Sequence, residues 1–403
     1  MLVRRVWRSS TFRAAAAFGA FGLAFAGANL LLAWVLPPSQ YALVALAVAI
    51  IQVCMPLGPA GADVVINRHH LAPTRALLAR VLLSSVVVAA AGLLVATLVY
   101  SLDPALVAAI VLATVAGGTN YAAAAVYQSR HEMRRSILVS ETQNLVLVLG
   151  GLAAFATGIQ KAWLPCAVYS LGYLVSASAA WSRLLGAPSD PSASAQSIQW
   201  SEALPLMGMS AAALVMIQLE RLLVPKLLTL EDLASFGVLA VVAGSPFRVL
   251  QMGVGYTMLP RLRAARTAPD RVRLLLEEGG VVLGLSSLAA AAVFVLTPFV
   301  TEVILRGKYE LPRGLVAVAV CSGVAKVAAS FTAGTANAIC REDQLLRLTL
   351  LGWLGIVVGV AGAFFGVPWG LEGVIAGVAL GWLFRACAAL WVAAPNLRPT
   401  YAA

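Results

Sequence analysis

Charged side chains are scarce in this sequence of 403 residues. Lys and Arg number 28 and Asp and Glu number 17, which makes 11% of the chain charged, whereas a typical soluble domain has about 25%. Hydrophobic residues make up 61%. A soluble protein of this size would carry far more charge to stay dissolved. The composition therefore excludes a soluble enzyme, a disordered chain and a coiled coil.

Cysteine and histidine are also rare, and chemical motifs are missing. The five cysteines lie singly in apolar runs, without a CxxC pair, which excludes a disulfide scaffold and is typical of small buried side chains. The three histidines, at 69, 70 and 131, form no cluster with cysteine. The sequence has no Walker A motif, nucleophile elbow or paired-carboxylate site, and its loops are short. We therefore expect no metal, no cofactor and no enzymatic activity.

Long apolar runs are what the sequence has in abundance. A helix needs about 20 predominantly apolar residues to cross the hydrocarbon of a bilayer. Pro56 and Pro59 interrupt one such run and Pro246 another, so we expect kinks there. The predicted fold class is an all-α polytopic membrane protein. We predict about 12 membrane spans. They lie at 14–36, 41–65, 77–100, 104–127, 137–157, 162–182, 203–224, 233–259, 275–299, 314–338, 345–366 and 370–393.

The distribution of Lys and Arg predicts the orientation. With the N-terminus inside, 20 of these residues fall on the inner side and 6 on the outer side, at 161, 221, 226, 306, 308 and 313. This excess predicts cytoplasmic N- and C-termini. The net charge of +11 then faces anionic lipid of the inner leaflet, and no nucleic-acid partner is expected. Two runs, 130–135 and 261–273, contain more basic residues than orientation requires. They either serve as further positive anchors on the inner side or form a cytoplasmic funnel for an anionic lipid headgroup.

One polar stretch, at 185–201, is rich in Pro, Ser and Ala and has six apolar stretches on each side. It predicts an N-terminal six-helix lobe at 1–184, a cytoplasmic linker at 185–201 and a C-terminal six-helix lobe at 202–403. The halves resemble each other weakly, at 37–50 with 229–242 and at 157–174 with 365–382. Six spans per half predict a parallel repeat, with a pseudo-twofold axis along the membrane normal and a central cavity.

Two cations lie about halfway along predicted spans, where a charge costs about 2.5–3.5 kcal/mol. Arg248 lies in the eighth span, with Gln251 on the same helical face, and Lys326 lies in the tenth. No acidic residue lies at the same depth. The two cations either form structural ion pairs or carbonyl caps, or they line a cavity that accepts phosphate or pyrophosphate.

Glu220 and Arg221 lie near the outer end of the seventh span. Adjacent residues on a helix do not face each other, so Glu220 either pairs with a cation on another helix or takes part in ion or proton coupling. Uncharged polar residues also occur in the spans, and we expect most of them to form interhelical hydrogen bonds and some to bind sugar hydroxyls. They are Asn29, Gln52, Asn120, Gln143, Asn144, Gln218 and Asn337.

Six segments form a pattern in their order along the chain. They are LPPSQYALVALAVAI at 36–50, IQLER at 217–221, TLEDLASFGVLAVV at 229–242, MLPRL at 258–262, ILRGKYE at 304–310 and VPWGLEGVIAGVAL at 367–380. Together they resemble the Wzx-type polysaccharide flippases of the multidrug/oligosaccharidyl-lipid/polysaccharide (MOP) exporter superfamily, and the resemblance covers most of the chain. Two departures occur, since Ala42 stands where glycine is usual and Glu220 replaces the commoner aspartate.

The resemblance implies two six-helix lobes that form a V-shaped cavity in the bacterial inner membrane. It also implies flipping of an undecaprenyl-pyrophosphate-linked oligosaccharide for O-antigen, capsule or exopolysaccharide synthesis, with a polysaccharide polymerase and glycosyltransferases as partners. Arg248, Lys326 and Gln251 become headgroup candidates, and Glu220 and Arg221 become coupling candidates. A cation-coupled multidrug antiporter of the same superfamily and a non-transporting scaffold of a glycan-assembly complex remain alternatives.

Overall fold

The computed structural model describes residues 10–186, 198–265 and 267–397, and the regular structure in these ranges is helical throughout. Each predicted apolar stretch lies in one helix or in two consecutive helices. The helices are α2 (Ser10–Val35), α3 (Pro38–Leu57), α4 (Ala62–His69), α5 (Arg75–Leu94), α6 (Pro104–Ser129), α7 (Met133–Ser140), α8 (Thr142–Thr157), α9 (Trp163–Gly186), α10 (Trp200–Leu227), α11 (Leu230–Val242), α12 (Gly244–Ala264), α13 (Ala268–Phe299), α14 (Arg313–Ile339), α15 (Glu342–Gly366) and α16 (Gly370–Ala393).

The lengths of these helices confirm the predicted fold class. Within the described ranges, 9 helical stretches are long and apolar enough to cross a membrane, or 10 if the bent pair α11 and α12 counts as one span. The last of these stretches, Asp343–Leu397, contains both α15 and α16. The shorter apolar segment Gly22–Val35 belongs to α2. The chain is therefore a multi-pass helical membrane protein.

The described chain divides into two compact units. We call Gly27–Leu222 the N-terminal unit, and Leu223 onward together with the described residues up to Ala26 the C-terminal unit. Most of α10 thus belongs to the N-terminal unit. The linker predicted at 185–201 falls largely on residues 187–197, which lie outside the described residues. The predicted lobes at 1–184 and 202–403 stay a prediction.

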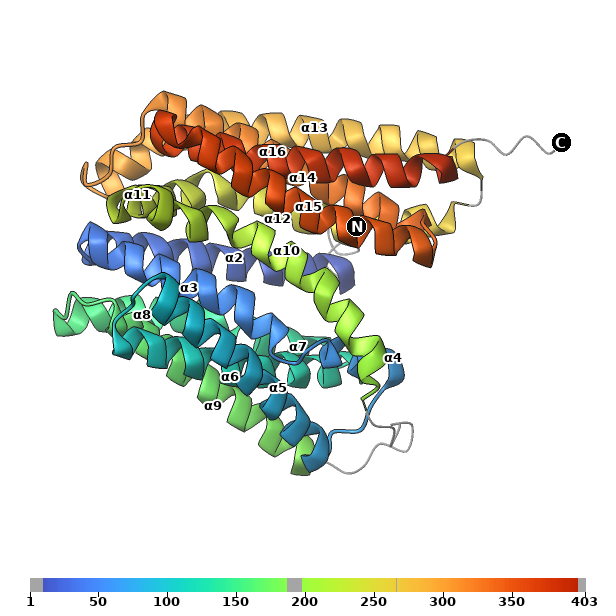
Figure 1. Ribbon diagram of the computed structural model, residues 1–403, viewed down its shortest axis with the longest axis horizontal. Coiled ribbons are helices and arrows are strands. Elements are labelled where there is room, and N and C mark those ends of the chain that lie inside the picture. Colours follow the sequence, from blue (N-terminus) through green and yellow to red (C-terminus); the bar gives the residue numbers. More distant parts are fainter. Residues whose placement is uncertain (1–9, 187–197, 266, 398–403) are drawn as a thin grey trace, which may run out of the picture. The chain divides into compact units, whose positions relative to one another are not determined.

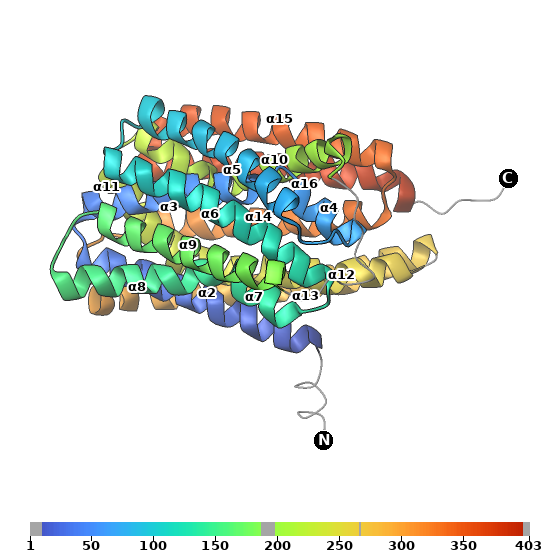
Figure 2. The same ribbon diagram turned by 90° about the horizontal axis from the view of Figure 1, so that it is seen from below.

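Small residues on α6 organise the N-terminal unit. Helix α6 packs on α3, α4, α5, α7 and α9, and Figures 1 and 2 show α5, α6 and α9 side by side. A Cβ atom at Gly58 would lie 2.9 Å from the Gly118 Cα, and one at Gly117 would overlap the Met55 side chain. Close approach of backbones through small residues is how membrane helices associate.

Glycines also join α15 to α16 in the C-terminal unit, where α14, α15 and α16 run side by side (Figure 1). A Cβ atom at Gly362 would lie 2.6 Å from the Gly377 carbonyl oxygen, and Gly366 and Gly373 meet in the same way. The glycine-rich run at 352–362 therefore serves helix packing, which dispersion drives in a bilayer.

Three predicted spans are divided between two α-helices. One is 137–157, which is divided at Glu141 between α7 and α8, and the other two are 41–65 and 233–259. The predicted span 41–65 is interrupted after α3 by the turn Gly58–Gly61, and α4 is a separate short helix. The predicted span 233–259 is interrupted at Ala243, where α11 and the start of α12 meet at 51°. The spans 41–65 and 233–259 are each the second predicted span in their half of the chain. Discontinuous helices at corresponding positions of two repeats mark the binding region in many transporters.

A helix-ending motif also occurs once in each half. Helices α5 and α13 continue as π-helical turns over Val95–Val99 and Val300–Ile304. The following amides bond alike, Tyr100 N to Val95 O and Leu305 N to Val300 O, then Leu102 N to Ala96 O and Gly307 N to Thr301 O. Each pair of donors is about 205 residues apart, from 305 − 100 and 307 − 102. This spacing supports the predicted repeat.

Candidate functional site

Arg248 lies just after the break in the eighth predicted span. Helix α12 begins at Gly244, so Arg248 is in its second turn, and its side chain is exposed. The first amides of a helix have no intrahelical acceptor, and the helix dipole makes this end positive. Gln251 lies one turn further on and is half-buried. The break therefore combines an arginine, an amide and a helix N-terminus.

Lys326 lies on the neighbouring helix at a similar level. Helix α12 packs on α14, and a Cβ atom at Gly323 would overlap the ring of Phe247, which is buried. Arg248 follows Phe247 directly, and Lys326 is three residues after Gly323 on α14. The two predicted headgroup cations thus come from one helix crossing in the C-terminal unit. Lys326 is half-buried there.

The coupling candidates lie in the N-terminal unit. Glu220 on α10 is 2% exposed, although the sequence places it near a span end. Arg221 is half-buried, and its Nη1 donates to Gln218 Oε1 at 3.2 Å. Gln218 Nε2 in turn donates to Gln52 Oε1 of α3 at 2.7 Å. The structure therefore brings Arg221, Gln218 and Gln52 together in one hydrogen-bond chain.

Gln52 and Gln218 enter the site although the sequence marks them only as polar residues within spans. The expected interhelical hydrogen bond is confirmed for this pair. Gln218 and Arg221 are three residues apart, so they lie on one face of α10. This spacing is the signal in the sequence that could have identified Gln218. Gln143 is a polar residue whose side chain lies outside the described part.

Further contacts hold α10 within the N-terminal unit at both of its ends. Glu202 accepts hydrogen bonds from Arg68 Nη1 at 2.8 Å and lies 2.9 Å from His69 Nε2. At the other end, the Tyr100 hydroxyl donates to the Leu222 carbonyl at 2.7 Å. The Gln52–Gln218 contact lies between these ends. Polar groups thus tie α10 to its unit at both ends and between them.

Ion pairs neutralise part of the dense basic runs. Three of their arginines pair with glutamates: Arg135 with Glu132, Arg261 with Glu278, and Arg273 with Glu277. In the segment at 304–310, which the charge bias predicts to lie on the outer side, Lys308 Nζ lies 5.7 Å from the ring centroid of Tyr309, and partial burial lowers the pKa of its ammonium group. Arg266 lies outside the described residues.

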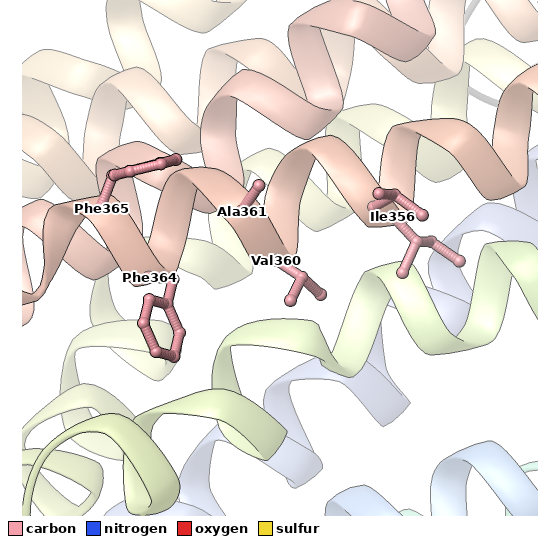
Figure 3. Close-up of a pocket in the computed structure, with 6 residues that line it drawn as sticks. Ile356, Val360, Ala361, Phe364 and Phe365 are labelled. Atoms are coloured by element: carbon pink, nitrogen blue, oxygen red, sulfur yellow. The ribbon is translucent and has the colours of Figure 1, made fainter.

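An apolar pocket of about 450 Å³ lies along α15. Figure 3 shows Val360 and Phe364 projecting from the same side of this helix. Its lining offers no hydrogen-bonding side chain, so the pocket cannot hold a charged headgroup. It is lined by Ile356, Val357, Val360, Ala361, Phe364 and Phe365.

The polar groups described above form two sets, one within each unit. Among the described residues, no group of three or more His, Cys, Asp and Glu side chains could hold a metal ion. The polar side chains are guanidinium, ammonium and amide groups on helices α3, α10, α12 and α14. These groups recognise oxygen-rich ligands.

The fold is similar to those of solved transporters. A multidrug resistance MATE family transporter of the MOP superfamily, in an inward-facing conformation, aligns with a TM-score of 0.71 and 15% identity over 94% of this chain and 96% of that one. The lipid II flippase MurJ, in an inward closed conformation, aligns with a TM-score of 0.65 and 10% identity over 95% of this chain and 87% of that one. A mutant form of the Vibrio cholerae MATE transporter VcmN aligns with a TM-score of 0.57 and 14% identity over 95% of this chain and 94% of that one.

These alignments define the class of the fold. No protein-family model and no curated protein matches the sequence. The chain has the fold of the MOP superfamily transporters, which both MATE transporters and MurJ share. Its structural neighbours are transporters and flippases rather than enzymes.

Proposed function

We propose that this chain flips an undecaprenyl-pyrophosphate-linked oligosaccharide from the inner to the outer leaflet of the bacterial inner membrane. The observation that carries the proposal is the pair Arg248 and Lys326, which come from one helix crossing within membrane spans. A headgroup that crosses hydrocarbon needs partners for its charge, and pyrophosphate oxygens accept hydrogen bonds from guanidinium and ammonium groups. The similarity of the fold to the lipid II flippase MurJ supports a lipid-linked cargo.

The proposed headgroup site uses the break before α12. Arg248 engages the pyrophosphate through two parallel N–H groups, and Lys326 supplies a second positive charge. Gln251 adds an uncharged donor one turn further along α12. Flipping forms no covalent intermediate, because the protein only lowers the cost of moving a polar headgroup through hydrocarbon. The cargo passes through the central cavity that the sequence resemblance implies.

Glu220 is the proposed coupling residue. A carboxylate that is 2% exposed within a span must be paired, hydrogen-bonded or protonated. A change in that state during transport would link cargo movement to an ion or proton gradient. Arg221, the next residue on α10, helps to set the local charge.

The cellular setting follows from the charge bias. The excess of Lys and Arg in the inner loops supports cytoplasmic N- and C-termini and contact with anionic inner-leaflet lipid. A flippase of this kind acts between glycosyltransferases, which build the lipid-linked oligosaccharide, and a polysaccharide polymerase, which consumes it. We place the chain at this step of surface polysaccharide synthesis.

Cation-coupled export of organic cations is a second candidate function. The fold similarity to a multidrug resistance MATE transporter and the buried Glu220 favour it. The exposed Arg248 opposes it, because a cation beside the cargo would repel a cationic drug. A non-transporting scaffold is the third candidate, and it requires neither cation.

The test is leaflet exchange of a fluorescent polyprenyl-pyrophosphate oligosaccharide by the purified protein in liposomes. Arg248→Ala and Lys326→Ala each remove a headgroup contact, so we expect exchange to slow by about tenfold or more. Arg248→Lys keeps the charge but not the bidentate geometry, and we expect an intermediate rate. Arg347→Ala, an exposed arginine near the start of α15, is the matched control and should exchange like wild type.

The outcomes separate the three candidate functions. Exchange that collapses in folded Arg248→Ala but not in Arg347→Ala supports the flippase. Exchange that is unchanged in both Arg248→Ala and Lys326→Ala would rule out this headgroup site. A wild-type protein that exchanges no lipid under any imposed ion gradient would leave the antiporter or the scaffold.

A further inference from the structure

Arg221 fixes the direction of the hydrogen-bond chain in the N-terminal unit. An arginine side chain only donates hydrogen bonds, so Gln218 must turn its oxygen toward Arg221. The Gln218 amide nitrogen is then the group that faces Gln52, and Gln52 must accept with its own oxygen. The Gln52 amide nitrogen therefore points away from the chain. This direction of donation follows from the chemistry of arginine. It does not depend on how the amide oxygen and nitrogen of the two glutamines are assigned.

The Gln52 amide nitrogen carries two N–H groups that need acceptors. No described residue accepts a hydrogen bond from this nitrogen, and Gln52 is only half-buried. Within a membrane span, an amide without a partner costs free energy, and water or a ligand satisfies it. Gln52 also lies in the last two turns of α3, close to the break at Gly58–Gly61. Breaks of this kind line binding regions in transporters.

We infer that Gln52 binds the sugar part of the cargo by donating its amide N–H groups to sugar hydroxyl oxygens. The inference rests on the proposed function and adds a second binding site on the N-terminal unit, apart from Arg248 and Lys326 on the C-terminal unit. A neutral amide donor suits a hydroxyl oxygen, whereas the pyrophosphate is better bound by the two cations. An organic cation finds no acceptor in an amide N–H group. Gln218 is a positioning residue, since it holds the Gln52 amide in this orientation.

The test compares two probes on the full-length protein in nanodiscs. One is undecaprenyl pyrophosphate alone, and the other is undecaprenyl pyrophosphate that carries a trisaccharide of neutral hexoses. We expect wild type to bind the glycosylated probe more tightly. Gln52→Met keeps the length of the side chain but removes the donor, so it should weaken binding of the glycosylated probe by about five- to tenfold and leave the bare probe unchanged. Arg248→Ala should weaken both.

A second variant separates binding from helix packing. Gln218→Met removes both hydrogen bonds of the chain but keeps the Gln52 amide. If Gln52 binds sugar, Gln218→Met affects the glycosylated probe less than Gln52→Met does. If the chain only joins α3 to α10, Gln218→Met affects both probes at least as strongly as Gln52→Met does, which would overturn the inference.

Two further results separate failure of the sugar site from failure of the proposed function. A folded Gln52→Met protein that still prefers the glycosylated probe by the wild-type factor would overturn the sugar site and leave the proposed function intact. A wild-type protein that binds neither probe would overturn both. If Gln52→Met does not fold, Gln52→Glu at about pH 8 replaces it, because a carboxylate keeps the acceptor for Gln218 and loses the donor.

Discussion

Glycine at position 61 is required by two independent features of the break after α3. Its φ of +79° lies in the left-handed region, which side chains with a Cβ atom rarely adopt. A Cβ atom there would also overlap the carbonyl of Ala203, at the start of α10. Gly61 thus lets α10 approach the break, at the same end as the Glu202 contacts with Arg68 and His69.

Gly61→Ala should therefore destabilise the protein strongly. Left-handed strain costs about 1–3 kcal/mol, and the overlap with the Ala203 backbone adds to it. Gly208→Ala on α10 is the matched control, because a Cβ atom there meets nothing within 4 Å. Thermal unfolding in detergent measures both. An unchanged melting temperature in Gly61→Ala would contradict the close packing described for this break.

At the residue scale, the sequence singles out charged side chains within spans but does not reveal the contacts that polar side chains form. Arg248, Lys326 and Glu220 are conspicuous because charges are expensive within apolar runs. Gln52 and Gln218 are 166 residues apart, and nothing in either segment specifies the other. Their pairing depends on how α3 and α10 pack, which no local pattern encodes.

The helices themselves follow closely from the sequence, and their breaks do so in part. About 20 apolar residues suffice to predict a span, and the described helices occupy the predicted positions. Pro246 predicts a kink, but the break lies three residues earlier, at Ala243. Pro246 is the third residue of α12, where a helix needs no amide donor. The proline therefore marks the start of a new helix rather than a bend within one.

The repeated ends of α5 and α13 could not be predicted in this way. The segments VATLVYSL and VTEVILRG share little sequence, yet their backbones form the same hydrogen bonds. Backbone donors and acceptors are the same for every residue except proline, so the motif leaves no clear trace in residue types. The structure thus adds a sign of the repeat that the sequence comparison misses.

At the element scale, the contact between α15 and α16 leaves no room for side chains at its glycines. Gly377→Ala would place a Cβ atom against the Gly362 backbone, so we expect the two helices to separate and the melting temperature to fall, with a loss of about 2 kcal/mol or more. Gly284→Ala on α13 meets nothing within 4 Å. It should be neutral or stabilise the helix by up to about 1 kcal/mol. Equal melting temperatures of the two variants would contradict the packing role of Gly377.

For the whole molecule, orientation is the first property to establish. The bias of Lys and Arg toward one set of loops predicts that both termini are cytoplasmic. Green fluorescent protein fused to either terminus should fluoresce in cells, and alkaline phosphatase fused there should be inactive, because each needs its own side of the membrane to fold. An active phosphatase at either end would contradict the predicted even number of spans or their direction.

The fold is compatible with two kinds of cargo, a lipid-linked glycan and an organic cation. Its structural neighbours include both multidrug transporters and a lipid II flippase. The charge of the side chains within the spans is what distinguishes the two kinds of cargo. Our proposal of an anionic headgroup rather than a cationic drug rests on Arg248 and Lys326, two cations within predicted spans.

The most direct measurement gives both cargoes to the same reconstituted protein. Liposomes that contain the wild-type chain are assayed for leaflet exchange of a fluorescent polyprenyl-pyrophosphate oligosaccharide and for uptake of ethidium, under identical proton and sodium gradients. We predict exchange of the lipid-linked oligosaccharide and no ethidium transport above that of empty liposomes. Ethidium transport without lipid exchange would contradict the proposed function.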